Sequence, residues 1–271
     1  RLHPRLGAMH ALAEACRNVS VVGAKPLAYT DGLNLGSPET PEGYHELAET
    51  IAGLKEASEA LGVPVVSGNV SLYNESGGKR SPPTAMVGVV GVRGVGRRAE
   101  RGFRRPGGVR PLIGEERGEL GASEVLYLLT GKEFGHPPRL DLGREKAVQE
   151  AIRDLIQRGL TRTAHDVAEG GLLLALAEMT FPYGVGATVE VREEGLEALF
   201  GEAPSRVLFT VEKTRLQEAT LLLEERGLPY RVLGETGGKS LTVLTPGGVL
   251  EWSLEELLSA WKAPLREVLD G

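Results

Sequence analysis

The stretch Pro26-Leu-Ala-Tyr-Thr-Asp-Gly-Leu-Asn-Leu-Gly36 sets the pattern for the first part of this chain. Its apolar beginning predicts a strand, and the polar and small residues from Thr30 onward predict a turn at the end of that strand. A second stretch has the same design, because the apolar run Val63-Pro-Val-Val66 leads into Ser67-Gly-Asn-Val-Ser71. Ligands of α/β folds bind where strands end, so both polar turns are candidate binding elements.

A helix is predicted between these two strands. Thr40-Pro41-Glu42 combines a capping hydroxyl, a proline in the first turn and an acid near the positive end of the helix dipole. An apolar stripe follows at helical spacing, and Gly62 ends it. The same spacing predicts an earlier helix around residues 6–16, and the apolar run 85–92 predicts a further strand.

The stretch 97–108 is rich in arginine and glycine, and it marks the expected boundary between two domains, residues 1–102 and residues 103–271. Beyond it, strands and helices mix without the regular alternation of a doubly wound sheet. This pattern predicts an α+β or mixed α/β architecture with two domains. The expected strands are residues 110–113, 125–129, 187–191, 207–211 and 241–245, and the expected helices are residues 143–157, 170–179, 214–226 and 254–269.

Composition and charge restrict the functions that the chain can have. Its 271 residues are 41% hydrophobic and 25% charged, with a formal net charge of −6. A nucleic-acid binder needs a concentrated basic face, so we expect no nucleic-acid partner and interpret the basic cluster 97–105 as a solvated connector. There is no apolar run long enough to span a bilayer, no signal peptide and one cysteine, Cys16. We therefore expect a cytoplasmic protein without a membrane partner.

Two familiar patterns are rejected. The run Gly234-Glu-Thr-Gly-Gly-Lys-Ser240 resembles a phosphate-binding P-loop, but it is one residue short between its glycines and a strand follows it. We interpret it as a hairpin turn. The five histidines and the single cysteine show no metal-ligand spacing, and no Ser-His-Asp or Cys-His arrangement is supported.

The two polar turns form the first candidate site. Asp31 and Asn69 offer the hard oxygen ligands that Mg²⁺ prefers, and Gly68 lets a phosphate approach the backbone closely. The alternative is that Asp, Asn and Gly are simply the residues that turns use.

The run Ala164-His-Asp-Val-Ala-Glu-Gly-Gly171 is the second candidate. A glycine pair at the start of a predicted helix exposes N–H groups that bind anions. His165, Asp166, Gly170 and Gly171 are therefore a candidate second anion site, and the alternative is a tight turn with close helix packing.

Five stretches carry a resemblance to a known family. They are Pro4-Arg-Leu-Gly-Ala8, Ala13-Glu-Ala-Cys-Arg-Asn18, the stretch from Pro26 to Gly36, Val65-Val-Ser-Gly-Asn-Val-Ser-Leu-Tyr-Asn-Glu75 and Ala164-His-Asp-Val-Ala-Glu-Gly-Gly-Leu172. Together they resemble the ammonia-using synthetase subunits of phosphoribosylformylglycinamidine synthases, the formylglycinamide ribonucleotide amidotransferases of purine biosynthesis. The resemblance covers nearly the whole chain, and it is to the second, C-terminal copy of a module that the family carries twice.

The resemblance implies an ATP-dependent C–N ligase. In the family, ATP phosphorylates the amide oxygen of formylglycinamide ribonucleotide, and ammonia from glutamine then displaces the phosphate to give formylglycinamidine ribonucleotide. Carried over by position, Asp31 and Gly68 would contact ATP, Asn69 would ligate Mg²⁺ and Ser71 would contact the ribonucleotide. The family's catalytic histidine lies in its first half, so we expect no catalytic residue in this chain and no activity of the isolated chain.

The resemblance also implies an architecture and partners. The expected fold is a ferredoxin-like or dimerisation-type α/β domain followed by a second α/β domain, as in the aminoimidazole ribonucleotide synthetase-like superfamily. The expected partners are the missing N-terminal half, a glutaminase subunit and a small bridging subunit, with a homodimer for the isolated chain joined through residues 26–92. The family leads us to expect a glycine pair before Ser123, where this chain has Gly121 and Ala122.

Two other functions compete with this interpretation. One is a complete sister enzyme, such as aminoimidazole ribonucleotide synthetase or selenophosphate synthetase. The other is a non-catalytic scaffold that holds a structural nucleotide at the turn 164–171.

Overall fold

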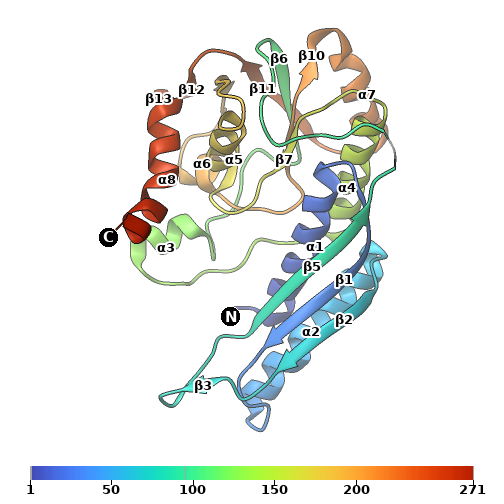
Figure 1. The fold of residues 1–271 in the computed structure, drawn as a ribbon, viewed down its shortest axis with the longest axis vertical. Coiled ribbons are helices and arrows are strands. Elements are labelled where there is room, and N and C mark those ends of the chain that lie inside the picture. Colours follow the sequence, from blue (N-terminus) through green and yellow to red (C-terminus); the bar gives the residue numbers. More distant parts are fainter. Residues whose placement is uncertain (1, 95, 271) are drawn as a thin grey trace.

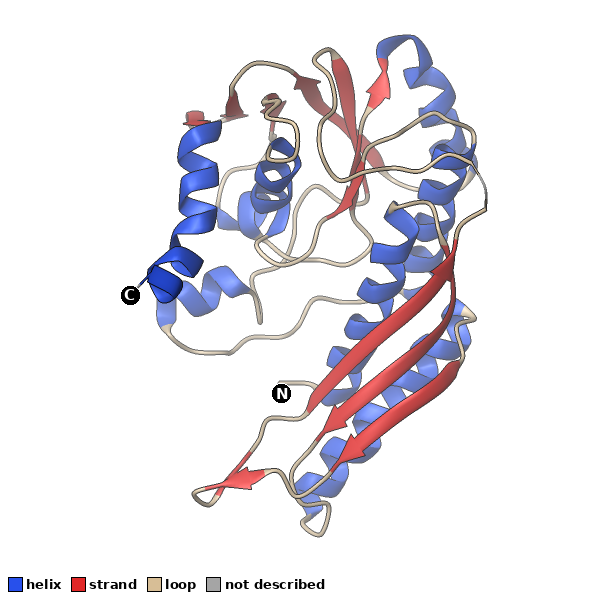
Figure 2. Ribbon diagram, viewed as in Figure 1, coloured by secondary structure: helices blue, strands red, loops and turns tan. Residues whose placement is uncertain are grey.

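The computed structural model describes residues 2–94 and 96–270, which form two sheets with helices packed against them (Figures 1 and 2). The first part contains a three-stranded sheet in the order β2-β1-β5. Its elements are α1 (Pro4–Val21), β1 (Lys25–Asn34), α2 (Pro41–Leu61), β2 (Val65–Ser71), the small hairpin β3 (Glu75–Ser76) and β4 (Lys79–Arg80), and β5 (Thr84–Val92). Both long helices lie on one side of this sheet (Figure 2), and no helix of the described residues covers its other face.

The predicted ends of α2 are confirmed. The Gly43 N–H donates to the Thr40 hydroxyl at 3.1 Å, and this contact caps the helix as the sequence predicts. Gly62 adopts the left-handed conformation, with φ of 71°, and ends the helix. Cys16 is buried in α1, where it acts as a small apolar side chain.

The predicted polar turns are part of the strands, which corrects the sequence analysis. β1 and β2 are parallel, and residues 30–34 of β1 pair with residues 67–71 of β2. The hydrogen bonds of this ladder satisfy the backbone that a turn would otherwise satisfy locally. Polar side chains are tolerated here because β2 is an edge strand with almost all of its residues exposed.

The connector, residues 93–107, contains no helix or strand in its described part, and it leads to an eight-stranded sheet in the second part. The strand order is β13-β12-β8-β11-β6-β9-β7, and β10 pairs with β6. The elements are β6 (Gly108–Ile113), α3 (Glu124–Thr130), α4 (Leu142–Gln157), β7 (Ala164–Asp166), α5 (Gly171–Thr180), β8 (Ala187–Glu190), α6 (Leu196–Phe200), β9 (Val207–Phe209), β10 (Val211–Glu212), the 3-10 turn Lys213–Arg215, α7 (Leu216–Glu225), β11 (Tyr230–Thr236), β12 (Ser240–Thr245), β13 (Gly248–Ser253) and α8 (Leu254–Asp270).

Helices cover both faces of the second sheet. Ile113 belongs to a core with α4 and α7, whereas its neighbour Leu112 belongs to a core with α5 and the residues packed around it. Successive side chains of a strand point to opposite faces, so β6 contributes to both cores. The mixed α/β architecture predicted from the sequence is confirmed. The boundary between residues 102 and 103 falls in the connector and stays a prediction.

Two sequence predictions for this part are wrong. Residues 125–129 form the helix α3 and not a strand, because the Ser123 hydroxyl caps it by accepting from the Leu126 N–H at 3.3 Å, and Gly131 ends it in the left-handed conformation. The turn 234–240 does not close a hairpin either. β8 lies between β11 and β12, and this insertion separates the two strands that the turn connects.

Among the described residues, no helix is long and apolar enough to cross a membrane.

Candidate functional site

The two polar stretches, residues 30–34 and 67–71, lie side by side in the sheet. Because β1 and β2 are parallel neighbours, Asp31 pairs with Gly68, Gly32 with Asn69, and Asn34 with Ser71. Paired residues of adjacent strands share a face, and the face alternates along each strand. Asp31 and Gly68 therefore lie on the face that carries the buried Tyr29 and Leu33, whereas Asn69 and Ser71 lie on the outer face.

Asp31 lies directly over Gly68. A Cβ atom at position 68 would be only 2.4 Å from Asp31 Oδ1, so the carboxylate occupies the space that a side chain would need. Burial raises the pKa of Asp31. Its carboxylate makes no hydrogen bond or ion pair with any other described residue, which leaves it able to accept from a ligand.

Asn69 and Ser71 occupy the outer face of the same sheet. Asn69 is exposed, and the Ser71 hydroxyl donates to Asn74 Oδ1 at 3.1 Å. The Asn74 amide donates in turn to the carbonyl oxygens of Leu35 and Ser71, at 2.9 and 2.8 Å. Asn74 thus fixes the end of β2 from its place just beyond Leu72 and Tyr73, a role that sequence reasoning missed.

The side chains of Asp31 and Asn69 do not converge, because they lie on opposite faces of the sheet. Both residues are expected from the sequence to offer oxygens suited to Mg²⁺, but side chains alternate along a strand, so one ion cannot contact both. The assignment of Asp31 to ATP and of Asn69 to Mg²⁺ stays a prediction. No cluster of three or more His, Cys, Asp or Glu that could hold a metal occurs in residues 2–94 and 96–270. Asn69 can supply one ligand of a magnesium ion, and other ligands would have to come from ATP, water or a second chain.

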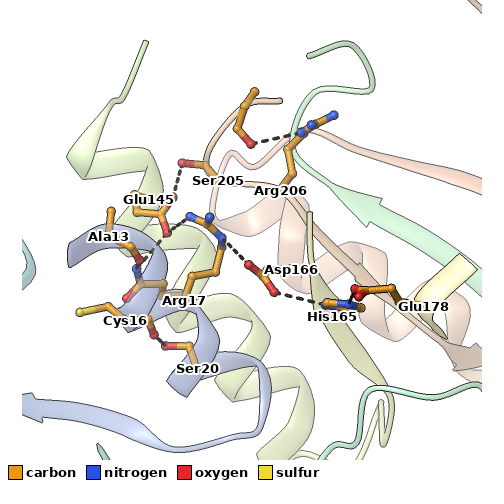
Figure 3. A network of polar contacts seen from close by, with 12 residues as sticks. Ala13, Cys16, Arg17, Ser20, Glu145, His165, Asp166, Glu178, Ser205 and Arg206 are labelled. Atoms are coloured by element: carbon orange, nitrogen blue, oxygen red, sulfur yellow. Dashed lines mark hydrogen bonds and ion pairs between the residues drawn. The ribbon is translucent and has the colours of Figure 1, made fainter. Parts of the chain in front are cut away.

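The second candidate site is a chain of buried polar contacts between the two parts (Figure 3). His165 lies between two carboxylates, with Nδ1 at 3.2 Å from Asp166 Oδ1 and Nε2 at 2.8 Å from Glu178 Oε2. Burial disfavours the charged ring, but the hydrogen bonds to Asp166 and Glu178 outweigh it and raise the pKa of His165. Two carboxylates around one ring favour the cationic form of the imidazole.

The glycine pair beside His165 already has protein partners. Gly170 and Gly171 both have positive φ, of 74° and 68°, and start α5. The Gly170 N–H donates to Glu202 Oε1 at 3.0 Å, and the Gly171 N–H donates to the Ala168 carbonyl at 3.1 Å. A carboxylate of the protein thus lies where a bound anion would accept, and the second anion site stays a prediction.

Arg17 joins this network to α4, and sequence reasoning missed it. Its guanidinium donates to Glu145 Oε1 at 2.8 Å and lies 3.7 Å from Asp166 Oδ2. Glu145 also accepts from Gln149 at 2.9 Å and from the Ser205 hydroxyl at 2.7 Å. These residues come from four separate stretches, so no local sequence pattern could have shown that they meet.

A cavity of about 570 Å³ lies next to this network, between α1 and the second part. Its wall includes Glu14, Arg17, Glu169 and Glu202. Burial, with Glu169 adding to it, raises the pKa of Glu14 to about 7. The cavity is large enough for a small ligand, and its lining is mixed in charge.

The two parts of the chain match two models of one protein family. Residues 1–92 match the N-terminal domain, and residues 112–245 match the C-terminal domain, of AIR synthase related proteins. The chain belongs to this family. AIR synthase related chains with high similarity to it include the phosphoribosylformylglycinamidine synthase subunit PurL of Thermus thermophilus, which is 97% identical over 271 residues, and that of Thermomicrobium roseum, which is 47% identical over 273 residues.

These two matches cover 100% and 98% of this chain, but only 37% of either relative.

Solved structures share the AIR synthase related fold. Thermotoga maritima PurL in complex with FGAR superposes with a TM-score of 0.79 at 21% identity, over 94% of this chain and 43% of that one. The hydrogenase maturation protein HypE in complex with ATP gives 0.69 at 17% identity, over 91% and 78%. The fold expected from the family resemblance is confirmed.

Proposed function

We propose that this chain is the ATP- and substrate-contacting module of a cytoplasmic purine-biosynthesis ligase that converts formylglycinamide ribonucleotide, ATP and ammonia into formylglycinamidine ribonucleotide. The contact of Asp31 with Gly68 carries the proposal, because it places a carboxylate that has no partner among the described residues beside the bare backbone of the neighbouring parallel strand. The 97% identity to a phosphoribosylformylglycinamidine synthase subunit supports the reaction class.

The two faces of β1 and β2 divide the proposed work. The Asp31 carboxylate accepts a hydrogen bond from an N–H or O–H group of ATP, and Gly68 leaves room for this carboxylate and for the nucleotide beside it. On the other face, Ser71 contacts the ribonucleotide and Asn69 contributes an oxygen to Mg²⁺. When bound, the ion neutralises charge on the phosphate that is transferred.

The reaction needs more than this chain. We propose that the catalytic histidine comes from a second module of the same enzyme, and that ammonia comes from a glutaminase subunit with a small bridging subunit. A Thermotoga maritima assembly named PurLQS, whose PurL has the same fold, supports such a complex. A module without its own catalytic base binds ligands but does not turn them over.

Calorimetric titration of Mg²⁺–ATP into this chain and its Gly68→Ala variant tests the nucleotide site. A methyl group at position 68 displaces the Asp31 carboxylate, so we expect clearly weaker binding. Gly7→Ala is the matched control, because nothing lies within 4 Å of its added Cβ. Equal ATP affinity of all three proteins would contradict the site. It would favour the scaffold alternative if Gly170→Ala abolished binding instead.

Turnover assays with ATP, ammonia and the ribonucleotide test the division of labour. We expect no amidine product from this chain alone. Product formed by rigorously pure chain would contradict the two-module proposal and favour a complete sister enzyme.

A further inference from the structure

A second cleft, of about 710 Å³, lies between the connector and the second part of the chain. It is lined by Arg97, Arg104 and Arg105 of the connector and by Arg162, Lys213 and Arg215. Glu212 is the one acidic residue of its lining among the described residues. Six basic side chains and one acidic side chain give the cleft a strong excess of positive charge, in a chain whose net charge is −6.

Two of these cations converge on one glycine. The Arg97 guanidinium fills the space beside Gly159, where an added Cβ would be 2.1 Å from Arg97 Nη1. Arg215 Nη1 donates to the Gly159 carbonyl at 3.3 Å. Gly159 has φ of 70°, a conformation that favours glycine, and its missing side chain leaves the space that Arg97 occupies. Like charges brought together repel unless an anion lies between them.

The charge of the cleft is only partly compensated within the protein. Lys213 pairs with Glu235 at 2.7 Å, Arg215 pairs with Glu218 at 2.7 Å, and Arg104 is 3.8 Å from Glu100. Arg97, Arg105 and Arg162 make no ion pair with any carboxylate in the described part of the chain, and Arg97 Nη1 donates to the Gln157 carbonyl at 3.4 Å. Their guanidinium groups keep donors that match phosphate oxygens.

The position of the cleft separates it from the proposed ATP site. β5 ends beside the beginning of β1, where Val92 pairs with Lys25, and the connector starts there. Asp31 lies in the second half of β1, and Gly68 is its partner on β2. Figure 1 shows the connector running from the upper end of β5 to β6, close to β10 and α7.

We propose that this cleft binds a small oligophosphate, of the class formed by nucleoside triphosphates and inorganic tripolyphosphate. Its volume fits one such molecule, and three uncompensated arginines supply the opposing charge. Because Arg97 and Arg105 belong to the connector and Arg162 to the second part, the bound anion ties the connector to the second part.

Calorimetry with tripolyphosphate and, separately, with ATP tests this assignment on the whole chain. Replacing Arg97 and Arg162 together by glutamine should weaken tripolyphosphate binding about a hundredfold, roughly tenfold for each lost charge-assisted contact. The matched control is R117Q with R144Q, which removes two exposed arginines of the second part outside the cleft. This control should change the affinity by less than about twofold.

Further variants locate the ligand and monitor folding. Gly68→Ala should keep the tripolyphosphate affinity, so that failure of the proposed ATP site and failure of this cleft are distinguishable. The lysine pair R97K with R162K keeps both charges and should restore part of the binding. Protection of the connector from limited proteolysis by tripolyphosphate should be lost in the glutamine pair but kept in the control.

Three results would overturn the proposal. The first is absence of tripolyphosphate binding by the unaltered chain at millimolar concentration, and the second is equal affinity of the glutamine pair and the control. The third is tighter binding of a single-stranded oligonucleotide than of tripolyphosphate. In the Gly68→Ala variant, which lacks the proposed ATP site, tighter binding of ATP than of tripolyphosphate makes the nucleoside part of the recognised ligand, and equal affinity assigns recognition to the phosphates alone.

Discussion

The buried guanidinium of Arg17 donates to the carboxylate of Glu145 across the joint between the two parts of the chain, with 2.8 Å between Nη1 and Oε1. Arg17 belongs to α1 and Glu145 to α4, and both side chains are almost fully shielded from solvent. Burial of two charges is tolerated only when each has partners, and Gln149 and Ser205 complete the set for Glu145.

Loss of this pair should destabilise the chain strongly. In Glu145→Gln, the buried charge of Arg17 loses its main counter-ion, and we expect the free energy of unfolding to fall by about 3–5 kcal/mol. The exposed pair Arg5–Glu56, at 2.7 Å, is the control, and Glu56→Gln should cost less than about 1 kcal/mol. Urea unfolding of both variants measures the difference, and similar losses would contradict this account.

Stability should fall as the pH rises through 7. The pKa of Glu14 in the folded chain is about 7, above its ordinary value of 4.5, because burial and the neighbouring Glu169, Asp166 and Glu145 oppose its ionisation, with Arg17 acting in the other direction. A carboxyl whose pKa is raised by folding stabilises the fold below its unfolded pKa, and this contribution is lost as the pH rises through the folded value.

Glu14→Gln should therefore flatten the pH dependence and raise the free energy of unfolding at pH 8 by roughly 2 kcal/mol, allowing for partial exposure. His165, whose pKa is also raised, loses its stabilising charge in the same direction, so some slope should remain in the variant. Denaturant titrations between about pH 5 and 9 measure both, and an unchanged slope in Glu14→Gln would refute the role of Glu14.

Asn69→Ala in the complete synthetase should slow the chemical step about a hundredfold, because it removes an oxygen ligand of Mg²⁺ and with it part of the transition-state stabilisation. Ser67→Ala, on the same outer face, is the control and should leave the rate unchanged. Single-turnover kinetics at limiting Mg²⁺ separates the two. A normal rate in Asn69→Ala would show that this residue only shapes the strand.

Ala122→Gly should stabilise the chain. Ala122 has φ of 62°, a left-handed conformation that costs a residue with a Cβ about 1–2 kcal/mol. Glycine removes this cost, but its larger unfolded-state entropy offsets part of the gain. We expect a gain of about 0.5–1 kcal/mol by thermal unfolding. Ala15→Gly inside α1 should instead lose about 1 kcal/mol. A loss in both variants would contradict the strain at position 122.

The isolated chain should form a homodimer through the first sheet. Met86 and Val90 are 59% and 62% exposed on the uncovered outer face, and a second copy can cover them. Met86→Glu with Val90→Glu should yield a monomer of 28.9 kDa by light scattering, whereas the control Leu128→Glu in α3 should stay dimeric. A monomer in the unaltered chain, or a dimer that only Leu128→Glu disrupts, would exclude this interface.

Local chemistry determined much of the first part from the sequence by itself. Thr40 and Gly62 mark the ends of α2 because a capping hydroxyl and a left-handed glycine act within one turn of the helix. The family resemblance likewise rested on short motifs, and the AIR synthase related domains at residues 1–92 and 112–245 confirm it.

Only the tertiary structure decided what depends on partners distant in the chain. Residues 67–71 continue β2 because β1 offers them a ladder, and this register alone puts Asp31 with Gly68 on one face and Asn69 with Ser71 on the other. The arginines of the connector are an ordinary solvated run in the sequence, and they line a basic cleft because the fold places them beside Arg162, Lys213 and Arg215. Pairing and charge depend on distance in space, which the spacing of residues along a chain does not specify.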